Sequence, residues 1–385
     1  MCIRDRQRRF NSLIYSGIYN SRTGVNNTNV FSVSEDITKS LDPAYRSIQK
    51  LYAEDTNLII FQEDKVSRAL IDKDAIYSAE GGGTVTSSNL VIGQVVPYLG
   101  EFGISTNPES FAIFGFQKYF ADKQKGSILR RSRDGITEIN NYGMRDFFRD
   151  QLGTLNSSAK LVGGYDVHTR QYVLSIQNQS GSYNTLSFDE EVKGWTSRYS
   201  YKPNWMFSLN NNFLSIEDNK HSLYRHYSDT TNRCSFYGVN NDADITFILN
   251  ANPSLMKNFN TVNYEGSNGW EVDYFKSDLE GFDQVNASWI ENQDVTSIVK
   301  SYDEGKYTDG GVIYRSGFNR KENRYVANLI NANPNKRPGE VIFGDSMSGI
   351  KGYFATVKIS TDQSTDTGGP KELFAVGSNF VVSSY

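Results

Sequence analysis

The three histidines of this sequence are the first side chains to test for metal chemistry. His168, His221 and His226 are the only histidines among the 385 residues, and the last two lie in one region. A zinc site needs further Cys, His or carboxylate ligands at matching spacing, which the two neighbouring histidines lack. His168 falls in an expected turn, where we interpret it as a solvated residue. We therefore predict no metal site.

Carboxylates are the second candidates, for acid–base catalysis. The run Asp189-Glu190-Glu191 is one stretch of sequence, whereas catalysis needs two carboxyl groups in different environments across a cleft, so a solvated turn is expected. Ser364-x-Asp366-x-Gly368 begins the hairpin signature of some glycosidase propellers, yet Lys371 stands where the aromatic residue should pack. Ser132-Arg133-Asp134-Gly135 has the wrong spacing, and we interpret both segments as glycine turns.

Three further motifs have structural explanations. Gly81-Gly82-Gly83 lacks the Lys-Ser/Thr that follows a phosphate loop, so a hairpin tip explains it. The basic run Arg130-Arg131-Ser132-Arg133 is interpreted as a solvated strand face or as a salt-bridging contact with a neighbouring subunit. Cys234 has no nucleophile arrangement around it and is expected to be a half-buried strand residue. The sequence thus predicts no catalytic residue, no cofactor-binding residue and no enzyme.

Charge and composition narrow the class of protein and its partners. Lys and Arg number 40 against 44 Asp and Glu, which gives a net charge of -4. Nucleic acid is therefore excluded as the main partner, because phosphate binding needs a concentrated basic surface. No window approaches the ~20 apolar residues of a membrane-spanning helix, so no membrane partner is expected. With 24 Tyr, 23 Phe and 32 Gly, the composition favours aromatic-rich strands joined by turns.

Short hairpins are the elements expected to position these residues. Strand, turn and strand signals follow one another over 58–66, 113–130, 161–176 and 206–227. Their turns are spaced by roughly 45 to 60 residues, as in four-stranded propeller blades. We predict a mainly β, antiparallel fold with a propeller-like first domain, and an ordinary antiparallel sandwich is the alternative. One short helix is predicted over 42–53, where Asp42 can cap and Pro43 suits the first position.

Two domains and an artefact make up the predicted organisation. Asn252-Pro253 followed by Gly266-Ser267-Asn268-Gly269 marks the boundary. Residues 7–265 form the propeller-like domain with its short helix, and residues 266–385 form a smaller all-β domain. Residues 1–6, MCIRDR, equal the translation of the transposase adapter TGTATAAGAGACAG after ATG, when a purine follows. We interpret them as a sequencing-adapter artefact on a truncated metagenomic reading frame and exclude them from the fold.

Long distinctive stretches run along nearly the whole chain from about Phe10 onwards. They include LYAEDTNL at 51–58, GEFGISTNPESF at 100–111, GWTS at 194–197, FNTVNYEG at 259–266, RKENRYVAN at 320–328 and KELFAV at 371–376. Together they resemble a family of large virion structural proteins of tailed bacteriophages, chiefly marine contractile-tailed phages and their relatives. Members of that family extend further at the N-terminus, so this chain is expected to be the C-terminal part of one.

The resemblance implies a structural component of a virion, in a tail, baseplate or neck, which passes through the host cytoplasm during assembly. The implied partners are other virion proteins and copies of the chain itself, bound through large, wet, polar-rimmed interfaces. Large aromatic side chains commonly anchor such interfaces or the core beneath them. The candidate packing or interface anchors are Trp195, Trp205, Trp270, Tyr264 and Tyr353.

Two other functions stay open at this point. A β-propeller that binds or cleaves glycan at a host surface would show a funnel lined by paired carboxylates or by exposed Trp and Tyr. A bacterial surface adhesin would need an export signal. Because the true N-terminus is expected to be missing, the lack of such a signal does not exclude the adhesin.

Overall fold

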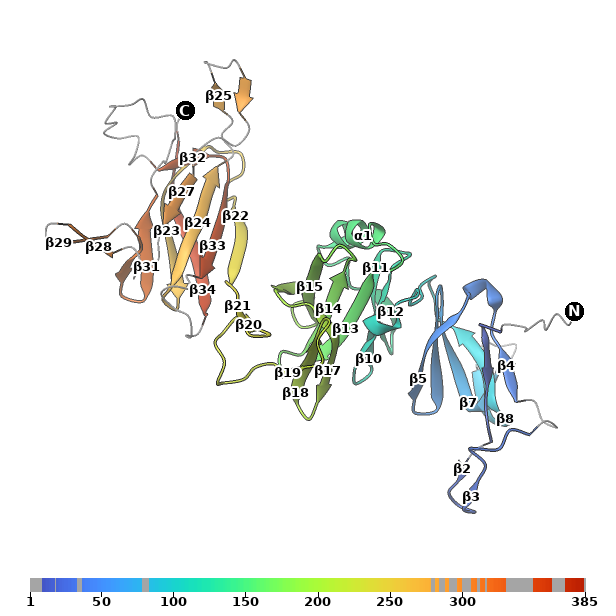
Figure 1. The fold of residues 1–385 in the computed structure, drawn as a ribbon. Helices are drawn as coiled ribbons and strands as arrows, with labels where there is room; N and C mark the ends of the chain where they lie inside the picture. The colour runs from blue at the N-terminus through green and yellow to red at the C-terminus, as the bar shows by residue number, and fades with distance from the viewer. Residues whose placement is uncertain are drawn as a thin grey trace, which may run out of the picture. The chain divides into compact units, whose positions relative to one another are not determined.

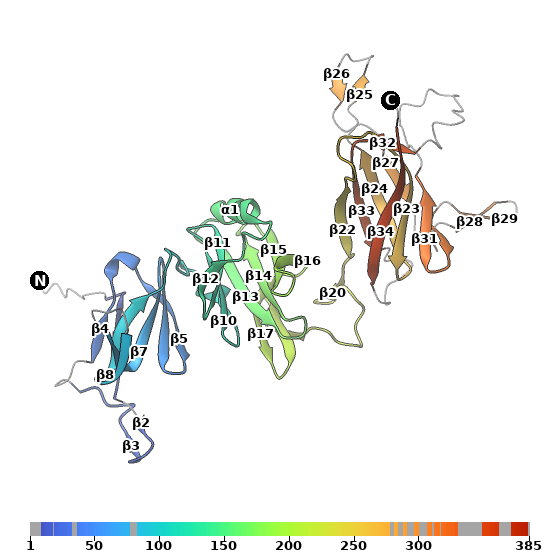
Figure 2. The ribbon, with the colours of Figure 1, turned by 180° about the vertical axis from the view of Figure 1, so that it is seen from behind.

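The chain folds into two compact units, Met1–Tyr227 and Ser228–Tyr385, each described by itself. A computed structural model, drawn in Figures 1 and 2, describes residues 9–17, 19–32, 37–77, 83–277, 281–283, 288–290, 296–299, 306–309, 312–315, 317–329, 349–361 and 371–383. The units consist mainly of antiparallel strands, which confirms the predicted fold class. No helix in these ranges is long and apolar enough to cross a membrane.

Unit 1 is a series of antiparallel meanders, which we number as sheets one to four. Within each sheet the strands lie side by side in chain order. The strands are β5 (Ile48–Glu54), β6 (Asn57–Gln62), β7 (Val66–Tyr77) and β8 (Gly83–Pro97) in sheet one; β9 (Ala112–Phe114), β10 (Gln117–Asp122), β11 (Ser127–Ser132) and β12 (Gly135–Glu138) in sheet two; β13 (Lys160–Asp166), β14 (Gln171–Gln177), β15 (Tyr183–Asp189) and β16 (Gly194–Tyr199) in sheet three; β17 (Pro203–Leu209), β18 (Asn212–Glu217) and β19 (Leu223–Arg225) in sheet four.

The four sheets pack face to face in chain order. Successive side chains of a strand point to opposite faces of the sheet, and β10 shows the consequence. Phe120 packs with Phe61 of sheet one, whereas its neighbour Tyr119 packs with Tyr172 of sheet three. Sheet three in turn contacts sheet four through β13 and β17. Each inner sheet is therefore buried on both faces, which explains the apolar runs in its strands.

Within the described part of the chain, the arrangement of unit 1 agrees with the predicted propeller in the packing of neighbouring sheets but not in the closure of a ring. Meanders of three or four strands that pack face to face, with β13 in contact with both β9 and β17, are arranged like neighbouring propeller blades. The described residues of unit 1 form a series of sheets and not a closed ring (Figure 1). The propeller therefore stays a prediction.

The helix predicted over 42–53 is wrong. Pro43–Tyr45 form one 3₁₀ turn, which Asp42 caps by accepting a hydrogen bond from the Ala44 N–H at 2.9 Å. Arg46 then takes a left-handed backbone conformation with φ 62°. The following residues form β5, which pairs with β6. The cap was predicted correctly, but pairing with the next strand overrides the helical spacing of the apolar residues.

The elements that flank the sheets complete the core of unit 1. The helix α1 (Arg145–Gly153), which we did not predict, connects sheets two and three, and it buries Phe148 and Leu152 between them. Before sheet one, strands β1 (Ser12–Ile14) and β4 (Thr38–Ser40) pair, as do β2 (Tyr19–Asn20) and β3 (Val25–Asn26). Leu13 and Leu41 from this N-terminal segment pack on sheet one.

Unit 2 is a β-sandwich with an aromatic core that includes Phe259, Phe275 and Tyr325. The short hairpins are β20 (Ser235–Phe236) with β21 (Val239–Asn240), β25 (Gly281–Asp283) with β26 (Ser288–Ile290), and β28 (Lys306–Asp309) with β29 (Val312–Arg315). The two facing sheets are β22 (Asp244–Leu249), β33 (Ala355–Thr361), β24 (Trp270–Ser277) and β27 (Thr296–Val299) against β30 (Asn319–Lys321), β31 (Arg324–Asn328), β23 (Lys257–Gly266), β32 (Ile350–Gly352) and β34 (Leu373–Val382).

The boundary between the units lies earlier than predicted. We expected it after residue 265, but unit 2 begins at Ser228. The reason is strand pairing: β22 pairs with β33, and β23 pairs with β34. Both early strands therefore belong to the sandwich, although the turn residues at 266–269 separate them from the rest in sequence.

Candidate functional site

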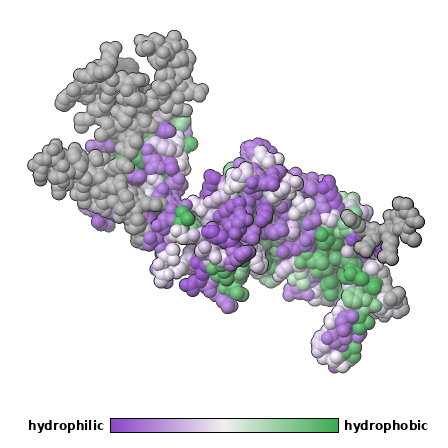
Figure 3. Space-filling view, in the orientation of Figure 1, coloured by the Kyte–Doolittle hydropathy of each residue, from purple (hydrophilic) through white to green (hydrophobic). Residues whose placement is uncertain are grey.

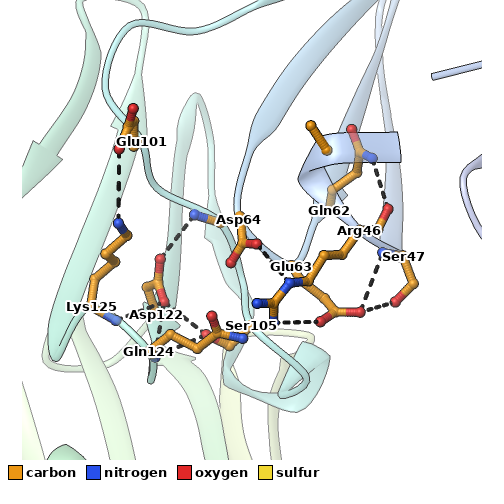
Figure 4. A network of polar contacts seen from close by, with 12 residues as sticks. Arg46, Ser47, Gln62, Glu63, Asp64, Glu101, Ser105, Asp122, Gln124 and Lys125 are labelled. Atoms are coloured by element: carbon orange, nitrogen blue, oxygen red, sulfur yellow. Dashed lines mark hydrogen bonds and ion pairs between the residues drawn. The ribbon is translucent and has the colours of Figure 1, made fainter. Parts of the chain in front are cut away.

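A polar network joins sheets one and two at their hairpin ends (Figure 4). Arg46 forms ion pairs with Glu63 at 3.7 Å and Asp64 at 3.1 Å, both in the turn between β6 and β7. Glu63 also accepts a hydrogen bond from the Ser47 N–H at 3.2 Å. Because Arg46 and Ser47 immediately precede β5, the network fixes the start of the sheet against its first hairpin.

Asp122, at the end of β10, is the buried centre of this network. Its carboxylate accepts hydrogen bonds from the Gly103 N–H at 3.0 Å and the Ser105 hydroxyl at 2.7 Å. It also accepts from the backbone N–H groups of Gln124 and Lys125 in its own turn. Burial raises the pKa of Asp122, although these hydrogen bonds favour its charged form. One carboxylate thus holds the linker between the sheets and the turn of sheet two.

The same turn chemistry recurs in sheet three. Asp166 and Asp189 each end a strand and accept hydrogen bonds from the backbone N–H groups two and three residues later. Such aspartate turns satisfy donors that the strand ladder leaves unpaired. The turns predicted within 113–130 and 161–176 therefore have an identifiable cause in the sequence.

A buried triad of charges crosses from sheet one to sheet two. Lys118 and Arg131, whose side chains are 1% and 8% exposed, both form ion pairs with Glu54 of β5. Arg131 also donates a hydrogen bond to the Tyr98 hydroxyl at 3.2 Å. Burial raises the pKa of Glu54, but the hydrogen bonds and charges of the two cations outweigh it and hold that pKa below its usual value. The triad fixes the orientation of the two sheets.

The prediction for the basic run 130–133, a solvated face or a contact with another subunit, is wrong. Arg131 lies in the buried triad, and Arg130 on the opposite face of β11 forms an ion pair with Glu190 at 2.8 Å. The Arg133 guanidinium lies 3.6 Å from the centroid of the Phe116 ring. In the acidic run, Asp189 ends β15, and Glu190 and Glu191 lie in the expected turn. Strand alternation separates consecutive charges and gives each a partner within the chain.

A third polar cluster joins sheets three and four around Asp166. This buried carboxylate accepts hydrogen bonds from the Tyr227 hydroxyl and from the Thr169 hydroxyl, the latter at 2.9 Å. The His168 ring stacks on Tyr227 with 4.2 Å between the ring centroids. His168 is exposed in its turn, as predicted, and its ring completes the cluster. Asp166 therefore ties the first hairpin of sheet three to Tyr227, the second residue after β19.

His226 is half-buried among aromatic rings beside this cluster. Its Nε2 shares a hydrogen bond of 2.7 Å with the Ser215 hydroxyl, and its ring lies 4.9 Å from that of Phe213 and 5.1 Å from that of Tyr201. Burial lowers the pKa of His226 to about 4, against the opposing effect of the Asp166 charge. Across the ranges that the structure describes, no group of three His, Cys, Asp or Glu residues could hold a metal ion.

Acid should destabilise unit 1 through His226. The folded pKa of about 4 lies below the ordinary value of 6.5, so the unfolded chain takes up the proton first as the pH falls. The stabilisation is complete above pH 6.5 and is lost towards pH 4. We expect the thermal unfolding midpoint of His226→Gln to change less than that of the wild type between pH 6.5 and pH 4. His221 is exposed, so the midpoint of His221→Gln should depend on pH as the wild-type midpoint does. If the midpoint of His226→Gln also kept the wild-type pH dependence, His226 would not be the group that destabilises unit 1 in acid.

Sheet four leaves an apolar face exposed at the end of the series. Trp205 and Leu209 of β17 are 56% and 57% exposed, and Leu223 of β19 is 56% exposed. The Phe207 ring lies 5.0 Å from the Trp205 ring on the same face. Figure 3 shows apolar surface over this sheet and over sheet one with its N-terminal segment. Patches of this kind mark sites of protein contact.

The five predicted anchors divide into core residues and surface residues. Trp195 packs against phenylalanine rings in the core of unit 1. Trp270 and Tyr264 are buried in the core of unit 2. Trp205 and Tyr353 are 56% and 44% exposed. The structure therefore places only the last two where they could contact another molecule without rearrangement of the fold.

The remaining motifs have structural roles or lie outside the described residues. Cys234 is half-buried as expected, but it occupies a turn with a left-handed φ of 58° and is not a strand residue. Burial raises the pKa of its thiol, which disfavours the reactive thiolate. Residues 132–135 form a glycine turn between β11 and β12, as predicted. Gly81-Gly82 and the segment 364–368 lie outside the described residues.

Residues 231–332, within unit 2, match the family model of the Crassvirus muzzle protein C-terminal domain. This match indicates a phage virion protein and confirms the resemblance at that level. No curated protein matches the chain. The closer relation to marine contractile-tailed phages stays a prediction.

Proposed function

We propose that this chain is a structural component of a phage tail, baseplate or neck that acts through contacts between subunits and without turnover. The match of residues 231–332 to the muzzle protein domain carries this proposal. Its partners are other virion proteins and copies of the chain itself. It resides in the virion, after assembly in the host cytoplasm.

The placement of charge in unit 1 supports this function. The carboxylates of Glu54, Asp122 and Asp166 each hold two neighbouring sheets or a sheet and its linker together. An assembly subunit needs this rigidity, because a preorganised surface loses less conformational entropy on binding. The acidic run Asp189-Glu190-Glu191 is the first candidate for glycan chemistry. Asp189 accepts a hydrogen bond from the Glu191 N–H in a turn, and Glu190 forms an ion pair with Arg130. The acidic run therefore does not support the glycan function.

Antibodies raised against unit 2 test the location in the particle. With purified phage and gold-labelled antibody, we expect label at the tail end of the particle in electron micrographs. Antibody preabsorbed with the purified chain should give no label. Label distributed over the capsid faces would contradict a place in the tail, baseplate or neck.

A further inference from the structure

β34, the last strand that the structure describes, lies at the edge of its sheet. It pairs with β23 along its length, and no other strand among the described residues pairs with it. Its ten residues, LFAVGSNFVV, include no charged residue and no proline. Native edge strands commonly carry such residues or are very short, because a free row of backbone N–H and C=O groups invites pairing with another chain.

The side chains of β34 add apolar surface to this free edge. Val376 and Phe380 pack against the core of the sandwich. Phe374, Val381 and Val382, by contrast, are 75%, 60% and 47% exposed. The register between β23 and β34 shifts at Glu265/Gly266 and leaves Phe374 without a paired residue on β23. Free backbone and exposed apolar side chains therefore occur on one strand, the combination that strand addition uses.

We propose that β34 pairs with β34 of a second copy of this chain, antiparallel, so that two sandwiches share one continuous sheet. Two observations support a copy of the chain as the partner. The strand carries no charge, so self-pairing brings no like charges opposite each other. β34 also pairs antiparallel with β23, so antiparallel pairing with a second β34 keeps the shared sheet antiparallel across the new interface. Two-fold interfaces are the commonest in homo-oligomers.

Symmetry restricts the register of this pairing. A two-fold axis perpendicular to the sheet keeps each side chain on the same face of the sheet. One residue must therefore pair with its own copy at the axis, and residues at equal sequence distances on either side of it pair with each other. With Ser378 at the centre, exposed apolar side chains meet apolar partners, and aromatic or β-branched cross-strand pairs are stabilising. The apolar pairs are Phe374 with Val382, Ala375 with Val381, and Val376 with Phe380.

The inference rests on the proposed function for its biological meaning, because it names one of the subunit contacts. The two can nevertheless fail separately. Self-association is measured on the purified chain, whereas membership of the virion is measured on purified particles. A chain that is found in particles but is monomeric in solution would refute only the strand pairing.

Analytical ultracentrifugation over a concentration series tests the dimer. We expect the wild-type chain to reach twice its monomer mass, and Val381→Lys to raise the dimer Kd at least tenfold by placing a charge on the shared edge. Val192→Lys, at a turn residue of unit 1 that is 69% exposed, is the matched control and should dimerise like the wild type. Equal unfolding midpoints would show that both variants fold. A monomeric wild type, or a Val381→Lys chain that dimerises normally, would overturn the proposal.

Disulfide trapping tests the register. In a background with Cys2→Ser and Cys234→Ser, the substitution Ser378→Cys places two thiols opposite each other at the two-fold axis. Opposed Cα atoms of antiparallel strands lie ~4.5–5.5 Å apart, within the range that a disulfide spans. Mild oxidation should therefore yield a covalent dimer, whereas Ser180→Cys, exposed in a turn of unit 1, should not cross-link. A dimer that Ser378→Cys fails to trap would refute the register centred on Ser378.

Discussion

Replacing Glu54 with glutamine should destabilise unit 1 by about 3–5 kcal/mol. The substitution removes the carboxylate that Lys118 and Arg131 share, and these two side chains are only 1% and 8% exposed. Both cations would then face each other in the interior with no compensating charge. A buried ion pair adds little net stability when formed, but the loss of one partner is costly because the remaining charge is desolvated and unpaired.

Urea unfolding, followed by tryptophan fluorescence, measures this loss because Trp195 lies in the core of unit 1. The matched control is Asp146→Asn, which removes an ion pair with Arg149 whose side chains are 79% and 63% exposed. Exposed pairs contribute little to stability, because solvent and salt screen their charges. If Glu54→Gln were as stable as this control, the triad would not fix the two sheets.

Replacing Gly163 with alanine should disrupt the junction between sheets two and three. An added Cβ would lie 2.0 Å from the Ser110 carbonyl oxygen and 3.0 Å from the Tyr172 hydroxyl. These two groups are themselves hydrogen-bonded at 2.7 Å, and the Ser110 hydroxyl accepts a hydrogen bond from the Ala121 N–H of β10. Overpacking costs typically ~1–3 kcal/mol and occasionally more. We expect the upper end or beyond, because backbone must move.

The thermal unfolding midpoint of Gly163→Ala should fall by several degrees, and Gly153→Ala provides the matched comparison. A Cβ on Gly153, at the end of α1, would meet nothing within 4 Å. Alanine is the better helix former by roughly 0.5–1 kcal/mol, so this control should be neutral or slightly stabilised. Equal midpoints for the two variants would show that the close approach at Gly163 is not a constraint on the fold.

The hairpins could be predicted from the sequence because their signals are local. Alternating apolar residues and an aspartate at the strand end are sufficient for the turns at Asp122 and Asp166. The helix expected after Asp42 failed for a non-local reason, since β6 supplies the pairing that makes Ile48–Glu54 a strand. The prediction of the boundary between the units failed for the same reason, because β23 pairs with β34, which lies near the end of the chain.

The buried charges of the candidate site could not be predicted from the sequence. Glu54 is separated by 64 residues from Lys118 and by 77 residues from Arg131, so no spacing rule connects them. The same holds for the aromatic anchors. Trp195 and Trp205 are ten positions apart on successive sheets, yet one packs in the core and the other is exposed, because only the second lies on the uncovered face.

Quantitative mass spectrometry of purified phage particles tests most directly whether this chain acts in the virion. We expect peptides from both units at a fixed molar ratio to the major structural proteins, unchanged through repeated gradient purification. Peptides abundant in the infected-cell lysate but lost from the particles would contradict the account.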